Sequence, residues 1–118
     1  MTRQFLALCG ASAILALAAA CGSSGSGGRQ VDITQRDDGC TPASVAVVVG
    51  EKLKLVVTNE SGKDSEIEGV DGTSLEEVEI PEGKTRSAGY TVPNGAGTHK
   101  IKCYQPDGVS TIIELVAS

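Results

Sequence analysis

The sequence has few of the residues that most often build binding and catalytic sites. Its 118 residues include no tryptophan, one phenylalanine, two tyrosines, one methionine and one histidine, and the formal net charge is −5. Nucleic-acid binding is excluded, because an acidic chain with so few aromatic side chains offers neither a basic surface nor stacking platforms. The one histidine, His99, has no nucleophile or orienting partner in a recognisable pattern, which predicts that the protein is not an enzyme.

The N-terminal segment carries a targeting signal. Arg3 provides a short positive region, and Phe5 to Ala20 form an apolar segment that ends in small residues before Cys21. This arrangement resembles a bacterial lipoprotein signal peptide, in which the cysteine thiol receives the lipid. We therefore predict a signal peptide over residues 1–20, followed over residues 21–29 by the palmitate-bearing Cys21 and a flexible Gly/Ser tether. An ordinary secretory signal is the alternative, and both predict export.

The lipid and the tether together predict where the protein resides. The mature domain would sit on the extracytoplasmic face of the bacterial cell membrane, and the short Gly/Ser tether would keep it close to the surface. No charge-rich segment of the sequence indicates that the domain itself binds lipid. The membrane contact is thus predicted to be the N-terminal lipid alone.

Residues 30–118 have the pattern of one β-rich domain. Short runs of alternating apolar and polar residues are separated by turns rich in Gly, Pro and Asp, and no helical period appears in this region. Val45 to Val49 is apolar on both faces, which predicts a strand in the centre of a sheet. The pattern predicts an all-β, Greek-key β-sandwich of about seven or eight strands. The expected strands cover residues 30–34, 44–49, 52–59, 65–70, 74–80, 85–92, 98–104 and 110–116.

The penultimate strand ends in a cysteine. His99, Ile101 and Cys103 alternate along one face of the run 98–104, and a Pro-Asp-Gly turn follows. Cys103 is therefore expected at the inward end of a strand, just before a loop.

Two cysteines remain in the mature domain once Cys21 is lipidated and Cys9 is removed with the signal peptide. The exported compartment permits a disulfide between Cys40 and Cys103. Such a bond closes a loop of about 60 residues, which contributes roughly 4 kcal/mol in the chain-entropy model. The same thiols are also potential metal ligands, so the residues alone leave both interpretations open.

Several segments, taken in order, resemble the cupredoxin-like domains of exported bacterial proteins. The most similar variant is the cupredoxin-like domain of periplasmic iron-uptake lipoproteins, which pairs an early Asp-x-x-Cys-x-Pro element with a late cysteine. Here that element is Asp37-Asp38-Gly39-Cys40-Thr41-Pro42. The other matching segments are Val56-Val57-Thr58-Asn59, Ser65-Glu66-Ile67-Glu68, Ile80-Pro81-Glu82-Gly83 and Gly97-Thr98-His99-Lys100-Ile101-Lys102-Cys103.

A blue-copper centre does not follow from this resemblance. Such a centre needs two imidazoles and a thiolate, usually with an axial thioether. In the family pattern the first histidine falls near Ser65, the second near Pro106 and the methionine near Val109, and none is present. His99 lies about 13 Å from Cys103 along an extended strand, too far to join the same ligand set. The inventory therefore excludes a blue-copper electron carrier.

The two-cysteine variant of the family implies a different site, with copper or iron bound by cysteine and carboxylate. Carried over to this sequence, it assigns Cys40, Glu66 and Cys103 as metal ligands, and Glu68 and Asp107 as additional candidates. Strand alternation works against Glu66, because it turns that carboxylate away from the core. The implied function is copper or iron handling in the cell envelope, with an envelope metal-transport protein as partner.

Two other functions are consistent with the sequence. If Cys40 and Cys103 form a disulfide, the domain is a non-enzymatic structural or protein-binding module on a scaffold that has lost its metal. An immunoglobulin-like adhesion domain is the third interpretation, which the absence of a core tryptophan does not favour. The acidic patch formed by Glu76, Glu77 and Glu79, with Glu66 and Glu68, is expected to be a solvated face.

Overall fold

The computed structural model describes residues 28–118. The predicted signal peptide, the predicted lipidation site Cys21 and most of the Gly/Ser tether lie outside the described residues. Within residues 28–118, no helix has the length and apolar character required to span a membrane.

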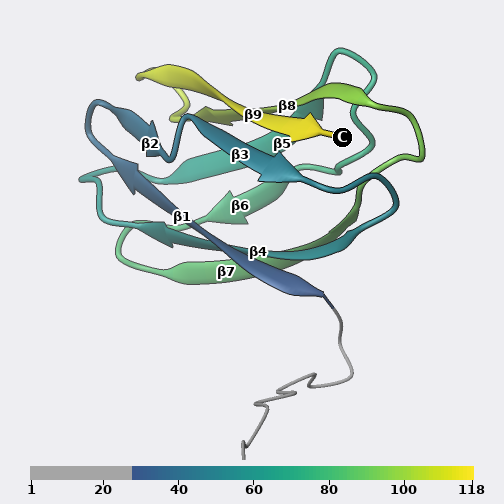
Figure 1. Ribbon diagram of the computed structural model, residues 1–118. Coiled ribbons are helices and arrows are strands. Elements are labelled where there is room, and N and C mark those ends of the chain that lie inside the picture. Colours follow the sequence, from purple (N-terminus) through teal and green to yellow (C-terminus); the bar gives the residue numbers. More distant parts are fainter. Residues whose placement is uncertain (1–27) are drawn as a thin grey trace, which may run out of the picture.

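Two β-sheets pack face to face in the described part of the chain (Figure 1). Their nine strands are β1 (Arg29–Arg36), β2 (Gly39–Thr41), β3 (Ser44–Val47), β4 (Lys52–Asn59), β5 (Ser65–Val70), β6 (Val78–Ile80), β7 (Thr85–Thr91), β8 (Gly97–Tyr104) and β9 (Ser110–Ala117). The strand order is β2-β1-β4-β7 in the first sheet and β3-β9-β8-β5-β6 in the second. The pairs β1–β4 and β3–β9 are parallel, and the other neighbours are antiparallel. The predicted all-β sandwich is confirmed.

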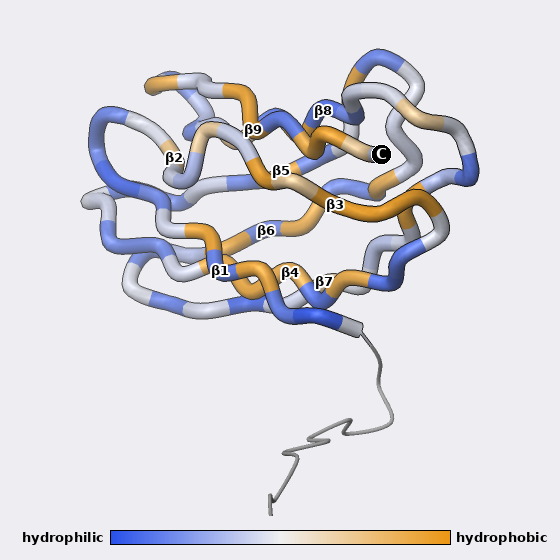
Figure 2. The backbone as a smooth tube through the Cα atoms, in the orientation of Figure 1, coloured by the Kyte–Doolittle hydropathy of each residue, from blue (hydrophilic) through white to orange (hydrophobic). Residues whose placement is uncertain are grey.

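Alternate residues of the strands fill the space between the sheets. In β4, Leu53, Leu55 and Val57 are each 1% exposed or less, whereas the residues between them are partly open to solvent. Figure 2 shows this alternation as orange and blue segments along β1, β4 and β9. Burying one such side chain contributes roughly 1.5–3 kcal/mol, so the two-residue period that predicted the strands also supplies the core.

The prediction of a central strand over residues 44–49 is wrong. β3 ends at Val47 and lies at the edge of its sheet, where it pairs with β9. Val47 is buried, whereas Val48 is 60% exposed. A run of valines has the same composition whether or not another element covers it, and single exposed apolar residues are tolerated on protein surfaces. The sequence therefore could not distinguish a central strand from this edge strand.

Two short strands also differ from the prediction. Residues 39–41, which are outside the expected strands, pair with the end of β1 as β2. β6 begins at Val78 and not at residue 74, because Leu75 lies in a loop where its carbonyl accepts a hydrogen bond from Gly69 N at 2.9 Å. Segments of three residues are too short to show an alternating pattern.

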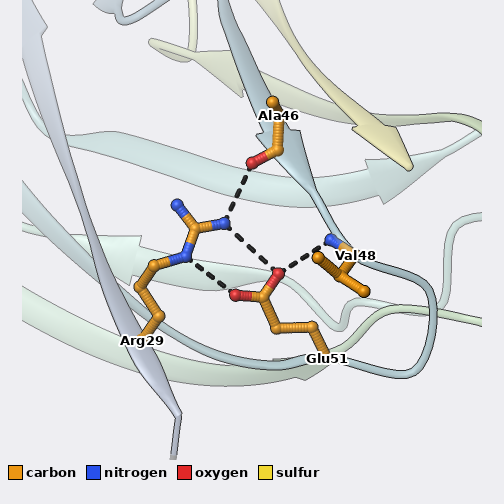
Figure 3. Close-up of polar contacts among 4 residues, drawn as sticks. All are labelled: Arg29, Ala46, Val48 and Glu51. Atoms are coloured by element: carbon orange, nitrogen blue, oxygen red, sulfur yellow. Dashed lines mark hydrogen bonds and ion pairs between the residues drawn. The ribbon is translucent and has the colours of Figure 1, made fainter. Parts of the chain in front are cut away.

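An ion pair ties the start of β1 to the opposite sheet (Figure 3). Arg29 donates from Nε to Glu51 Oε1 at 2.8 Å and from Nη2 to the Ala46 carbonyl of β3 at 2.9 Å. Glu51 Oε2 also accepts from the Val48 backbone N–H at 2.8 Å. The hydrogen bond from Arg29, and to a smaller degree that from the Val48 N–H, hold the pKa of Glu51 below its ordinary value of 4.5. The first residue of the sandwich is thereby fixed to the turn after β3.

We expect this contact to make stability depend on pH in the acid range. Since the carboxyl of Glu51 has a lower pKa in the folded than in the unfolded chain, its contribution is complete above pH 4.5 and is lost as pH falls through the folded pKa. The pair is partly exposed, so the contribution is about 1 kcal/mol or less. Urea unfolding at pH 7 and pH 3 should show that Glu51→Gln removes this part of the pH dependence. Glu82→Gln, an exposed control, should retain it, and equal pH profiles for Glu51→Gln and the wild type would contradict the assignment.

Candidate functional site

Cys103 occupies the end of β8, on its inward face. It is fully buried beside Ile101, as the alternation of β8 predicted. A tight turn follows, in which Gln105 N donates to the Val109 carbonyl and Gly108 N to the Gln105 carbonyl, both at 2.9 Å. This turn reverses the chain into β9 and leaves the Cys103 side chain between the sheets, at one end of the sandwich.

Cys40 reaches the same place from the other sheet. The Cys40 backbone N–H donates to Thr111 Oγ1 at 3.0 Å, and Thr111 lies directly opposite Cys103 in the β8–β9 ladder. Gly39 permits this approach, because its φ is +130° and a Cβ there would overlap the side chain of Thr111. The two cysteines form a disulfide with a Cα–Cα distance of 6.3 Å, and the predicted Cys40–Cys103 bond is confirmed. It joins the sheets covalently.

A buried amide lies against both sulfurs. Gln35, on β1 opposite Cys40, is 0% exposed, and its Oε1 is 3.1 Å from Cys40 Sγ and 3.0 Å from Cys103 Sγ. Gln35 was not among the predicted site residues, because the first expected strand ended at Thr34. The available signal was the position of Gln35 in the inward series after Val31 and Ile33.

Further polar side chains are buried near this end of the second sheet. Ser65 and Gln105 are 1% and 5% exposed, and neither Ser65 Oγ nor Gln105 Nε2 has a hydrogen-bond partner among residues 28–118. The antiparallel β5–β8 ladder pairs Glu66 with Tyr104. Ser65, which precedes Glu66, and Gln105, which follows Tyr104, are therefore the next residues at that end of the ladder. The family pattern described above places histidine ligands near Ser65 and Pro106, and here these positions hold a serine and a proline.

The structure places Glu66 away from the cysteines. Ile67 faces Cys103 across the ladder and is fully buried, so its neighbour Glu66 lies on the outer face of the sheet, opposite Tyr104. Hydrogen bonding to Glu66, with burial and a 3.0 Å bond to Glu77 Oε2, raises the pKa of Tyr104 above its ordinary value of 10. The carboxylate of Glu66 therefore lies beside Tyr104 on the outer face, away from the two sulfurs.

The other predicted ligands do not approach the sulfurs either. Glu68 pairs with Lys102 on the outer face at 3.6 Å, and Asp107 is exposed in the turn after β8. His99 lies opposite Leu115, four residues before Cys103 along β8. Within residues 28–118, no three histidine, cysteine, aspartate or glutamate side chains are grouped so that they could hold one metal ion. The structure thus brings together Cys40 and Cys103 alone from the predicted set.

Residues 7–112 match the cupredoxin-like domain family. The chain belongs to this family. No protein with a curated description is significantly similar to this cupredoxin-like sequence.

Solved structures share the cupredoxin-like fold at low sequence identity. A copper binding protein, determined by NMR in the apo form, has a TM-score of 0.58 and 13% identity over 75% of this chain and 86% of its own. Dithionite-reduced auracyanin from Roseiflexus castenholzii has a TM-score of 0.57 and 13% identity over 78% and 98%. A Cu-containing nitrite reductase from Thermus scotoductus has a TM-score of 0.56 and 13% identity, and the match covers 76% of this chain but 31% of the reductase. At such identities the likeness shows the fold alone.

A blue-copper centre does not fit the residues of this cupredoxin-like domain. The sequence supplies one histidine where that centre needs two. His99 lies four residues before Cys103 along β8, too far away to bind the same metal ion. Cys103, at the end of β8, is bonded to Cys40. Any metal chemistry at this end of the sandwich must therefore start from the two sulfurs.

Proposed function

We propose that this cupredoxin-like protein handles copper in the bacterial cell envelope through Cys40 and Cys103. The proposal includes export and an N-terminal lipid on Cys21, which the lipoprotein-like residues 1–21 support. The observation that carries it is the meeting of two cysteines from different sheets at one end of a cupredoxin-like sandwich. We further propose that the protein is a carrier or store and not an enzyme, and that it exchanges copper with an envelope metal-transport protein.

The proposed chemistry begins with reduction of the disulfide. A dithiol reductant supplies two electrons and two protons, the Cys40–Cys103 bond breaks, two thiols form, and the reductant becomes a disulfide. Both thiols then lose their protons when they bind a soft metal ion. Thiolate ligands select Cu(I), whereas harder ions prefer oxygen. Because the carboxylate of Glu66 lies on the outer face, the geometry favours copper over iron.

Copper binding should depend on the state of the disulfide. The full chain carrying Cys9→Ser and Cys21→Ser has Cys40 and Cys103 as its remaining thiols. We expect the reduced form to take one Cu(I) per chain from a chromogenic Cu(I) chelator under anaerobic conditions, and the oxidised form to take none. Absence of copper transfer to the reduced form would contradict the proposal.

A second function is favoured by the disulfide itself. If the bond stays closed in the envelope, the domain is a stapled structural or protein-binding module without a metal. The absence of a third ligand group among residues 28–118 supports this alternative. A reduced protein that folds but leaves all copper with the chelator would establish it over the copper proposal.

A further inference from the structure

We infer that Gln35 favours the reduced state of the Cys40–Cys103 pair, because its amide oxygen accepts hydrogen bonds from both thiols. This inference concerns the thiol–disulfide equilibrium and does not depend on copper binding. Gln35 acts here as a positioning residue, since it contacts the sulfurs but exchanges no atom with them.

The position of Gln35 leaves little freedom to its side chain. It is 0% exposed, and its backbone carbonyl accepts a hydrogen bond from Glu60 N at 2.8 Å. Its Nε2 donates to the Arg36 carbonyl at 2.6 Å. Since this bond requires the nitrogen end of the amide, the oxygen end is the one that faces the sulfurs, at 3.1 and 3.0 Å.

No other donor is within hydrogen-bond distance of Gln35 Oε1 in the part of the chain that the structure describes. The neighbouring buried amide, Asn59, lies beside Gln35 in the β1–β4 ladder, but its Nδ2 donates to the carbonyls of Lys63 and Ile80, both at 2.8 Å. The Oδ1 of Asn59 accepts from Ser61, so this second amide is fully engaged. The two sulfurs are the hydrogen-bonding neighbours left to Gln35 Oε1.

Oxidation removes the hydrogen-bond donors from the two sulfurs. In the disulfide neither sulfur carries a hydrogen, and the buried oxygen of Gln35 then has no donor, which is unfavourable. When a dithiol reductant delivers two electrons and two protons, the S–S bond breaks and two S–H groups form within reach of that oxygen. The hydrogen bonds exist in the reduced state alone, so Gln35 stabilises that state relative to the disulfide.

The equilibrium with dithiothreitol tests this inference. The protein with Cys9→Ser and Cys21→Ser is equilibrated in graded mixtures of reduced and oxidised dithiothreitol, and the thiols are trapped by alkylation and counted by mass spectrometry. We expect Gln35→Leu to lower the equilibrium constant for reduction about tenfold, which corresponds to a fall of about 30 mV in reduction potential.

Two further variants separate this effect from a general loss of stability. Ile33→Val removes a methylene from the same inward face of β1 without altering a contact to sulfur, and it should change the constant less than twofold. Gln35→Met retains the length of the side chain and serves if Gln35→Leu does not fold. A folded Gln35 variant with an unchanged or larger reduced fraction would overturn the inference. The copper-transfer assay is a separate measurement, so a failure of the copper proposal would leave this result intact.

Discussion

Replacing Cys40 with alanine is expected to lower the free energy of unfolding by about 4 kcal/mol. Cys40 and Cys103 are 63 residues apart in sequence, so the bond removes a large loop-closure entropy from the unfolded chain. It also joins the two sheets at one end of the sandwich. In a domain of this size, such a loss should lower the melting temperature by roughly 15 °C or more.

Urea unfolding with and without a dithiol reductant measures this effect. Reduced wild type, Cys40→Ala and Cys103→Ala should be similarly stable, because each has lost the same cross-link. Reductant should have no effect on either variant. If oxidised wild type and Cys40→Ala differ by less than about 1 kcal/mol, the disulfide is not the main constraint on this fold.

Replacing Cys103 with serine is expected to weaken Cu(I) binding by the reduced protein about a thousandfold or more. A hydroxyl is a hard ligand, and its exchange for a thiolate leaves Cu(I) with one sulfur donor. Cys103 is also fully buried at the end of β8, next to Cys40. Competition against chelators of graded affinity gives the change in dissociation constant.

Glu66→Gln is the matched control for this experiment. The carboxylate is on the outer face beside Tyr104, so its neutralisation should leave Cu(I) affinity unchanged. It should instead alter the alkaline titration of Tyr104. Equal losses of affinity for Cys103→Ser and Glu66→Gln would show that Glu66 reaches the metal, and the two-sulfur site would then be wrong.

Much of the sandwich could be predicted from alternation. The ends of β4 and β5 coincide with the predicted residues 52–59 and 65–70, because both strands bury one face and expose the other to some degree. Alternation also placed Ile101 and Cys103 inward on β8. The pattern failed for the apolar run 44–49, where β3 ends at Val47 and lies at the edge of its sheet, because apolar composition does not show whether another strand covers the run.

The candidate site was predictable only in part. The inventory of thiols and the expected compartment left two interpretations open, a Cys40–Cys103 disulfide or a ligand pair, and the structure contains the disulfide. Glu66 was assigned by family resemblance, and the ladder between Ile67 and Cys103 places it on the opposite face. Gln35 was missed, since a polar residue at the end of a strand looks like the start of a turn until the partner strands are known. Which side chains meet across two sheets depends on register, which a single sequence does not specify.

The copper coordination of the reduced protein decides whether Cys40 and Cys103 form a metal site. X-ray absorption at the copper edge should be recorded on the Cys9→Ser, Cys21→Ser protein after reduction and loading with one equivalent of Cu(I). We expect a first coordination shell made of sulfur, which is lost in Cys103→Ser. A shell of nitrogen or oxygen ligands, or one that persists without Cys103, would contradict it.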